Sequence, residues 1–233
     1  MKVVILCGGK GTRLAEETNL NPKPMVKIGD KPIIWHILKF FNHYGHNEFI
    51  LATGYKNEVI NDFFYNNKDF PNVKTIFTGA KTMTGGRILR LKSILDKEEE
   101  FFMTYGDGVT NLNLNELLKF HKSHNKIATV TAVHPPVRFG EVEINKNQVT
   151  NFAEKKQAKS SWISGGFFIL NKKIFNYIKN DETVFEEYPL EKITSEGQLM
   201  AYKHEGFWQC MDTLREKKLL DDLWYKGVAP WKV

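Results

Sequence analysis

Short apolar runs rich in β-branched residues alternate with longer segments of helical periodicity along the first 135 residues of the chain. Residues 2–6 (KVVIL) read as a buried strand, and a helix is predicted from Pro32 to Gly45, because proline favours helix starts and glycine favours helix ends. Repeated strand–helix alternation predicts an α/β fold with a mostly parallel sheet and helices on both faces. Further strands are expected at 48–53, 73–77, 101–105 and 127–133, and further helices at 56–64, 85–95 and 115–124.

The pattern changes after about residue 135, where polar and apolar residues alternate through a predicted β-hairpin at 138–155. A strand at 162–170, a short helix at 172–180 and a pair of strands within 198–210 are expected next. A closing helix at 212–227 begins at a good N-cap, either Asp212 or Thr213. Because the chain has neither a linker-like stretch nor an internal repeat, we expect one domain over residues 1–233.

Composition excludes several classes of protein. The chain is 42% apolar and 26% charged, which indicates a folded globular protein. No apolar stretch approaches the roughly 18 residues of a membrane span, and the N-terminus lacks the features of a signal peptide. Cys7 and Cys210 have no CxxC spacing. We therefore expect reduced thiols, a cytoplasmic protein and no membrane partner.

The net charge of +6 does not by itself indicate a nucleic-acid partner. The lysines are scattered, and no run of five or more basic residues occurs. Basic residues gather instead in the loop after the first expected strand. We therefore expect a small anionic ligand and no nucleic acid.

The loop from Cys7 to Leu14 (CGGKGTRL) leaves the first expected strand at the sheet edge where ligands bind in open parallel sheets. Glycines allow backbone N–H groups to approach phosphate oxygens, and Arg13 can bind a phosphate through two parallel hydrogen bonds. Neither the dinucleotide fingerprint nor the P-loop fits this spacing. A turn that carries solvated charges is the alternative, but Lys23, held between Pro22 and Pro24, favours a phosphate site.

These segments resemble a known family. GGKGTRL, PKPM and KP resemble the signature of the sugar-1-phosphate nucleotidyltransferases. The chain also resembles the glucose-1-phosphate cytidylyltransferase branch of this family. The segments that carry this resemblance are AEETNLNPKPM, KPIIWHI, MTGGRILRL, TYGDGV, PPVRFG, GGFFILN, GFWQCMDTLRE and KGVAPWK. The resemblance covers nearly the whole chain. It implies a single Rossmann-like domain in which residues 1–135 are mainly nucleotide-binding, while 136–233 form a small β-rich sugar-binding part and the closing helix.

The reaction implied is transfer of a cytidylyl group from CTP to glucose 1-phosphate, which gives CDP-glucose and pyrophosphate for deoxysugar or surface-polysaccharide synthesis. The second pKa of a phosphate is near 6, so the sugar phosphate is already largely a dianion and needs no general base. The resemblance implies that Lys23, at the α-phosphate, and Arg13, on the triphosphate, are catalytic. It further implies a nucleotide-binding set of Leu6, Gly8, Gly9, Lys10, Gly11, Thr12, Arg13, Thr82, Arg87 and Gly106.

A magnesium ion is the cofactor that the resemblance implies. Asp107, between Gly106 and Gly108 at the end of an expected strand, suits Mg²⁺, which binds one or two carboxylates and keeps several waters. Asp212 is the second carboxylate by resemblance, although helix N-cap is the alternative role for it. Glu154 and Lys155, together with Lys23, are implied to bind the sugar phosphate; here Lys156 stands where the family has proline.

The chain departs from the branch in the stretch between FFYNN and MTGG, which is shorter than the branch pattern. Two alternatives stay open. One is a nucleotidyltransferase that uses another nucleotide, UTP or dTTP, or that acts on another phosphorylated acceptor. The other is an inactive nucleotide-binding regulatory module, which the joint presence of Arg13, Lys23, Asp107 and Asp212 opposes. We expect a homo-oligomer.

Overall fold

A computed structural model describes residues 1–18, 21–136, 141–153 and 161–233. Its main sheet confirms the mostly parallel α/β fold, because only β11 runs antiparallel to its neighbours. In spatial order the seven strands are β12 (Leu199–His204), β8 (Ala128–Val133), β11 (Ile163–Asn171), β6 (Glu100–Tyr105), β1 (Val3–Cys7), β4 (Phe49–Thr53) and β5 (Val73–Phe77).

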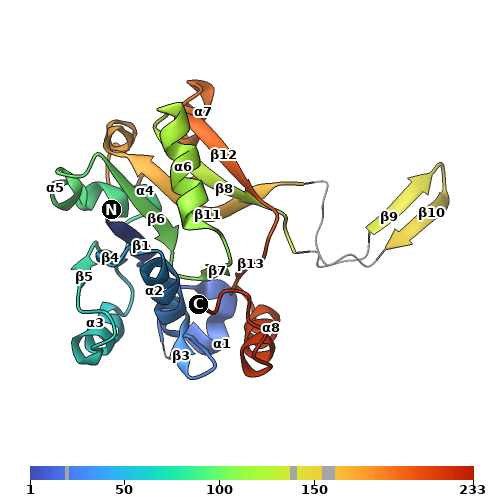
Figure 1. Ribbon diagram of the computed structural model, residues 1–233, viewed down its shortest axis with the longest axis horizontal. Helices are drawn as coiled ribbons and strands as arrows, with labels where there is room; N and C mark the ends of the chain where they lie inside the picture. Colours follow the sequence, from blue (N-terminus) through green and yellow to red (C-terminus); the bar gives the residue numbers. More distant parts are fainter. Residues whose placement is uncertain (19–20, 137–140, 154–160) are drawn as a thin grey trace.

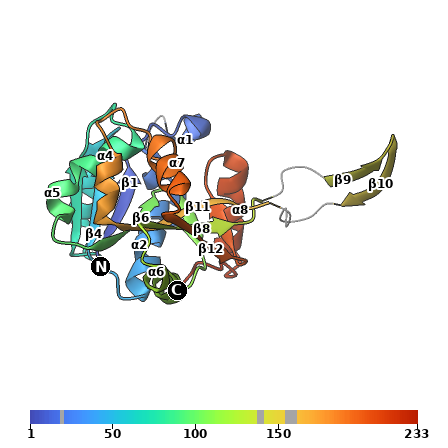
Figure 2. The ribbon, with the colours of Figure 1, turned by 90° about the horizontal axis from the view of Figure 1, so that it is seen from above.

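Helices cover both faces of this sheet (Figures 1 and 2). Alternate residues of β1 enter different cores: Val3 and Ile5 pack in one hydrophobic cluster, while Val4 and Leu6 pack in the other. Burial on both faces explains why the strands read as continuous apolar runs. The first cluster includes residues of α2 (Ile33–His43), α3 (Asn57–Asn66), α6 (Leu114–His124) and α8 (Leu214–Tyr225); the second includes residues of α4 (Thr84–Arg90), α5 (Lys92–Leu95) and α7 (Tyr188–Ser195).

Several predicted elements differ in detail. The helix predicted at 85–95 is divided at Leu91 into α4 and α5, and the short helix predicted after residue 171 is the 3-10 helix η3 (Lys172–Tyr177). The two strands predicted within 198–210 both exist, but they do not pair with each other. Instead β12 joins β8, whereas β13 (Trp208–Cys210) pairs antiparallel with β7 (Gly108–Thr110). That prediction of pairing was wrong.

The predicted hairpin is present as β9 (Glu141–Asn145) and β10 (Gln148–Ala153), paired antiparallel. It forms a separate two-stranded sheet that extends away from the main sheet in both views (Figures 1 and 2). Val142, Ile144 and Val149 are exposed on it. Within the described ranges, no helix is long and apolar enough to cross a membrane.

The topology brings distant segments to one sheet edge. The strands β1, β4 and β6 are parallel neighbours, so the loops that follow their carboxyl ends lie side by side. The loop after β1 contains η1 (Thr12–Leu14) and α1 (Ala15–Thr18), and η2 (Lys23–Met25) precedes the small strands β2 (Lys27–Ile28) and β3 (Lys31–Pro32). The β7–β13 pair then joins the loop after β6 to the loop before α8, with the Met211 N–H donating to the Asp107 carbonyl at 2.8 Å.

Candidate active site

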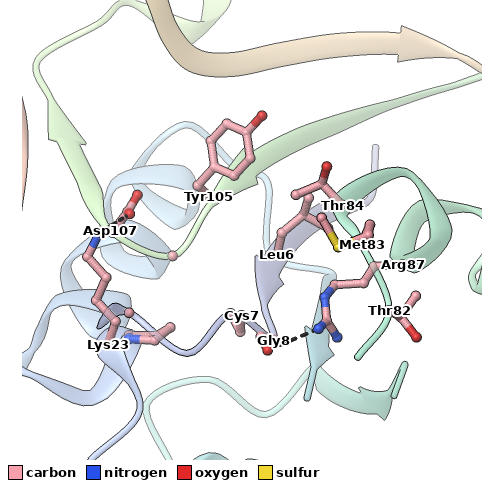
Figure 3. A pocket seen from close by; sticks show the side chains of 14 residues that line it. Leu6, Cys7, Gly8, Lys23, Thr82, Met83, Thr84, Arg87, Tyr105 and Asp107 are labelled. Atoms are coloured by element: carbon pink, nitrogen blue, oxygen red, sulfur yellow. Dashed lines mark hydrogen bonds and ion pairs between the residues drawn. The ribbon is translucent and has the colours of Figure 1, made fainter. Parts of the chain in front are cut away.

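A pocket of about 380 Å³ lies at the carboxyl ends of β1 and β6 (Figure 3). The glycine loop and the segment Thr82–Thr84 form parts of its wall, and a buried cation lies at each end. Much of the predicted nucleotide-binding set therefore comes together in one cavity. The lining residues that the sequence predicted are Leu6, Gly8, Gly9, Gly11, Lys23, Thr82, Arg87, Gly106 and Asp107.

Lys23 is held at one end of the pocket by a rigid backbone. Pro22 and Pro24 restrict the chain on both sides of it, and the Val26 N–H donates to the Lys23 carbonyl at 3.1 Å. Only 7% of the residue is exposed. Its ammonium donates to the carboxylate of Asp107 at 2.5 Å and also to that of Asp212. The sequence predicted these three residues for one site, and the structure brings them into contact.

Asp212 does not act as the helix cap. Thr213 is the N-cap of α8, and its side-chain oxygen accepts from the Glu216 N–H at 3.3 Å. The buried Glu216 carboxylate in turn accepts from the N–H groups of Asp212 at 2.7 Å and Thr213 at 3.0 Å, which completes a capping box. This box fixes the backbone of Asp212 while its carboxylate contacts Lys23.

Helix α8 connects both partners of that ion pair. Its N-terminal capping box holds Asp212, and further along the helix Asp221 accepts from the Gly29 N–H at 2.8 Å. Gly29 has φ of +64°, and a side chain there would lie 2.3 Å from the ring of Trp224. Because Gly29 belongs to the β2–β3 turn that follows Lys23, α8 supports the lysine segment and the aspartate together.

The carboxylates determine the protonation of Lys23. Burial lowers the pKa of its ammonium, but the negative charges of Asp107 and Asp212 and their hydrogen bonds outweigh that effect, so the pKa lies above its ordinary value. One cationic atom thus lies within hydrogen-bond distance of oxygens from two different loops. Two carboxylates that converge in this way are a donor set suited to a hard divalent cation, so the residues present fit Mg²⁺.

Arg87 lies at the other end of the pocket and has a different set of partners. Its guanidinium donates to the carbonyl oxygens of Gly8 (3.0 Å), Thr53 (3.1 Å) and Gly79 (2.8 Å) and to the Thr78 hydroxyl (2.9 Å). These oxygens lie in the last residue of β4 and directly after β1 and β5, so Arg87 joins three strand ends. Arg87 is a buried residue, since only 4% of it is exposed.

Two glycines of the loop are required by close packing. A Cβ at Gly8 would lie 2.0 Å from Nη1 of Arg87, whereas a Cβ at Gly9 would meet nothing within 4 Å. Gly11 has φ of +66°, and a Cβ there would lie 2.9 Å from Cβ of Lys23. The loop is therefore packed directly between the two buried cations.

The remaining predicted site residues are either exposed or lie outside the described part of the chain. Lys10 and Thr12 are exposed on the loop. Arg13 belongs to η1, and its side chain lies outside the part of the chain that the structure describes, as do Glu154 and Lys155 entirely.

Sequence reasoning missed Tyr105 and its partner Glu186. Tyr105 ends β6 and lines the pocket, and its hydroxyl donates to the Glu186 carboxylate, which also accepts from the Thr84 hydroxyl at 2.5 Å. Burial, followed by the charge of Glu186, raises the pKa of the Tyr105 phenol. Its position directly before Gly106 and Asp107 was the signal that could have identified it.

Comparison with known proteins agrees with the fold. The nucleotidyl transferase family model matches residues 2–214, and the chain belongs to this family of enzymes. Two similar proteins align with this chain over its whole length. The glucose-1-phosphate cytidylyltransferase of Salmonella typhimurium is 46% identical over 254 aligned positions, which span 100% of this chain and 99% of that protein. The probable glucose-1-phosphate cytidylyltransferase of Bacillus subtilis is 40% identical and is covered completely, as is this chain.

A solved structure with lower sequence identity has a similar fold. HddC from Yersinia pseudotuberculosis, complexed with GMP-PN, superposes with a TM-score of 0.77 at 25% identity, over 96% of this chain and 99% of that one. The alignment with the Salmonella enzyme is longer than this chain of 233 residues, so that relative has segments that this chain lacks. This agrees with the shortening noted in the sequence.

Proposed function

We propose that this enzyme transfers the cytidylyl group of CTP to glucose 1-phosphate and releases CDP-glucose and pyrophosphate. The observation that carries the proposal is the contact of Lys23 with both Asp107 and Asp212 at one end of a pocket that the glycine loop lines. The choice of CTP and glucose 1-phosphate rests on the two cytidylyltransferases that the chain resembles along its whole length.

In the proposed reaction, a phosphate oxygen of glucose 1-phosphate attacks the α-phosphorus of CTP. The new bond forms as the bond from the α-phosphorus to the oxygen that bridges to the β-phosphate breaks, and the electron pair leaves with pyrophosphate. Two anions have to be brought together, so positioning and positive charge supply most of the catalysis. Lys23 would bind the phosphate oxygens at the reacting centre, and Arg13 would bind the triphosphate.

The loop amides have a proposed role of their own. The N–H groups of Gly8, Gly9, Lys10 and Gly11 would bind phosphate oxygens, with the Thr12 hydroxyl beside them. Leu6, Thr82 and Gly106 would contact the nucleoside. For Arg87 the hydrogen bonds described above support an indirect contribution, in which it holds the Gly8 carbonyl and so shapes the loop. Glu154 and Lys155 remain the proposed sugar-phosphate ligands.

Asp107 and Asp212 would hold Mg²⁺ in the working enzyme. A bound magnesium ion would neutralise phosphate charge and help orient the triphosphate. The protein's contribution is to hold both carboxylates ready, one through the β7–β13 pair and the other through the capping box of α8.

Pyrophosphate release tests the proposal. Glucose 1-phosphate and Mg²⁺ would be supplied with CTP, UTP, dTTP, ATP or GTP in parallel. Lys23→Ala is the inactive control, and Lys119→Ala, at an exposed lysine of α6, is the matched control. Release with CTP that is abolished only in Lys23→Ala supports the proposal. Release with another nucleotide alone would overturn the cytidylyl assignment. Silence with every nucleotide and with several sugar phosphates would favour a binding module without chemistry.

A guanine nucleotide is the second candidate, because HddC, a structural neighbour at 25% identity, was solved with GMP-PN. The same assay with GTP and a series of sugar 1-phosphates separates the two. We further propose a cytoplasmic homo-oligomer that acts as a single domain over residues 1–233. Light scattering of the purified protein would test the oligomer, and limited proteolysis would test the domain.

A further inference from the structure

The ammonium of Lys23 lies where a shared cation would lie. It contacts Oδ2 of Asp107 at 2.5 Å and also Oδ1 of Asp212, and the side chain is only 9% exposed. Both carboxylates come from loops whose main chain is fixed by hydrogen bonds: the Asp107 carbonyl accepts from the Met211 N–H, and the Asp212 N–H donates to Glu216. The lysine has therefore taken a position that the fold prepares for positive charge.

The backbone of Lys23 cannot move away easily, but its side chain can. Pro24 packs so closely on Gly106 that a Cβ on the glycine would lie 2.8 Å from Cγ of the proline. Gly11 packs equally closely on Cβ of Lys23. Beyond Cβ, a lysine has a flexible aliphatic stem that ends in a compact charge. Rotation of this stem can carry the ammonium toward the glycine loop without any change in the main chain.

The lysine and a divalent cation cannot share the same two oxygens. Magnesium requires ligand oxygens at about 2.0–2.1 Å, and a point at that distance from both contacted oxygens overlaps the ammonium nitrogen. The second oxygen of Asp212 is already approached by the Cys210 thiol, whose sulfur lies 3.8 Å away. Binding of a cation at the two contacted oxygens thus requires that Lys23 leave them.

We infer that Lys23 competes with the divalent cation for Asp107 and Asp212 and becomes available to substrate phosphate when that cation binds. This inference rests on the proposed function and deepens it. The exchange keeps each carboxylate paired with positive charge throughout, which matters because a buried carboxylate without a partner is strongly destabilising. It also links two roles of one residue, since the ammonium released from the carboxylates lies in the cavity lined by the glycine loop.

Binding of Mn²⁺ to the full protein without nucleotide or sugar phosphate tests the inference. Free Mn²⁺ is measured by electron paramagnetic resonance for the wild type, Lys23→Met, Lys23→Arg and Lys119→Met, the last at an exposed lysine of α6. We expect Lys23→Met to bind Mn²⁺ at least about tenfold more tightly than the wild type, the factor that loss of a competitor worth roughly 1.4 kcal/mol would give. Lys23→Arg keeps the positive charge, so its Mn²⁺ binding should stay as weak as that of the wild type. Lys119→Met should also match the wild type.

Two further variants keep the test decisive. Lys23→Met combined with Asp107→Asn should lose the gained affinity, which assigns the Mn²⁺ to these carboxylates. If Lys23→Met does not fold, Lys23→Gln provides a neutral side chain that still donates hydrogen bonds, and it should show the same gain. Equal or weaker binding by the neutral variants, or no binding by any of them, overturns the inference. That result would leave the pyrophosphate assay of the wild type unaffected, so the two proposals fail separately.

Discussion

The two buried cations of the pocket, Lys23 and Arg87, are held in contrasting ways (Figure 3). Lys23 has two carboxylates as partners, which raise its pKa in spite of burial. Arg87 has three carbonyls and a hydroxyl, and burial lowers its pKa. The lysine therefore neutralises charges that another cation can also neutralise, whereas the arginine satisfies backbone oxygens that belong to the fold.

This difference indicates which cation is exchangeable. A guanidinium presents five donors in a fixed plane and suits several oxygens held in one geometry, whereas an ammonium is a point charge on a flexible stem. Removal of Arg87 should therefore disturb the loop that the pocket depends on. Removal of Lys23 should leave the loop in place and stop the chemistry.

The largest effect is expected from Lys23→Ala on the rate of transfer. Loss of a charge that stabilises the transition state typically costs about 10³-fold in kcat, and we expect at least that loss in pyrophosphate release. Circular dichroism should show that the variant is folded. A rate within tenfold of the wild type would contradict the role given to Lys23.

Arg87→Met should act mainly on stability. It leaves buried oxygens at the ends of β1, β4 and β5 without one of their donors, and we expect the free energy of unfolding to fall by about 3 kcal/mol. Arg87→Lys should recover only part of this, because one ammonium cannot reach all four oxygens. Urea unfolding measures both. A variant with unchanged stability and a raised KM for the nucleotide would show that Arg87 acts directly on substrate instead.

Gly8→Ala tests the packing between the loop and Arg87. The added methyl group would lie 2.0 Å from Nη1, so we expect a loss of about 1–3 kcal/mol from overpacking. Gly9→Ala is the matched control, because its Cβ has open space, and its stability should stay close to that of the wild type. In the Arg87→Met background most of the cost of Gly8→Ala should disappear. Equal losses for Gly8→Ala and Gly9→Ala would contradict the packing argument.

The last prediction concerns the pH dependence of stability, through a buried histidine. His121 contacts the Thr129 hydroxyl at 2.7 Å, and burial, together with the nearby His124 and Lys122, lowers its pKa to about 4. Glu100, 3.4 Å from Nε2, does not reverse this. The unfolded chain binds the proton more strongly, so this contribution to stability is complete above about pH 6.5 and is lost as the pH falls toward 4. Urea unfolding at several pH values should give a flatter profile for His121→Gln over that window.

Much of the fold could be predicted because it rests on local patterns. The runs that became β1, β4, β5 and β6 are continuous apolar segments, since helices cover both of their faces. Helix α7 was missed because it buries only Pro189 and Ile193, which is too few positions to give a helical period. The pairing of β12 and β13 was predicted wrongly, because alternation reveals a strand but not its partner, and both partners lie far away in the sequence.

In the candidate site, too, some features could be predicted from the sequence and others could not. Parallel strands end at a common edge of the sheet, and this rule was sufficient to place the glycine loop and Asp107 together from the amino-acid sequence. For Asp212, sequence left the choice between cap and ligand open, because Asp and Thr are both good caps. The choice depends on Glu216, which completes the box with Thr213. The partners of Arg87 could not be predicted from the sequence, because three of them are backbone carbonyls and carry no sequence signature.

The position of Asp212 also has a consequence for the newly made protein. Lys23 and Asp212 are separated by 189 residues, and the helix that supports both follows Asp212 directly. A growing chain is synthesised from its N-terminus, so the ribosome releases the glycine loop and Lys23 long before the second carboxylate. A chain interrupted before residue 212 would have the glycine loop and Lys23 with only one of the two carboxylates that contact this lysine. Translation itself thus delays the assembly of the Lys23–Asp107–Asp212 cluster until all seven strands of the main sheet have been synthesised.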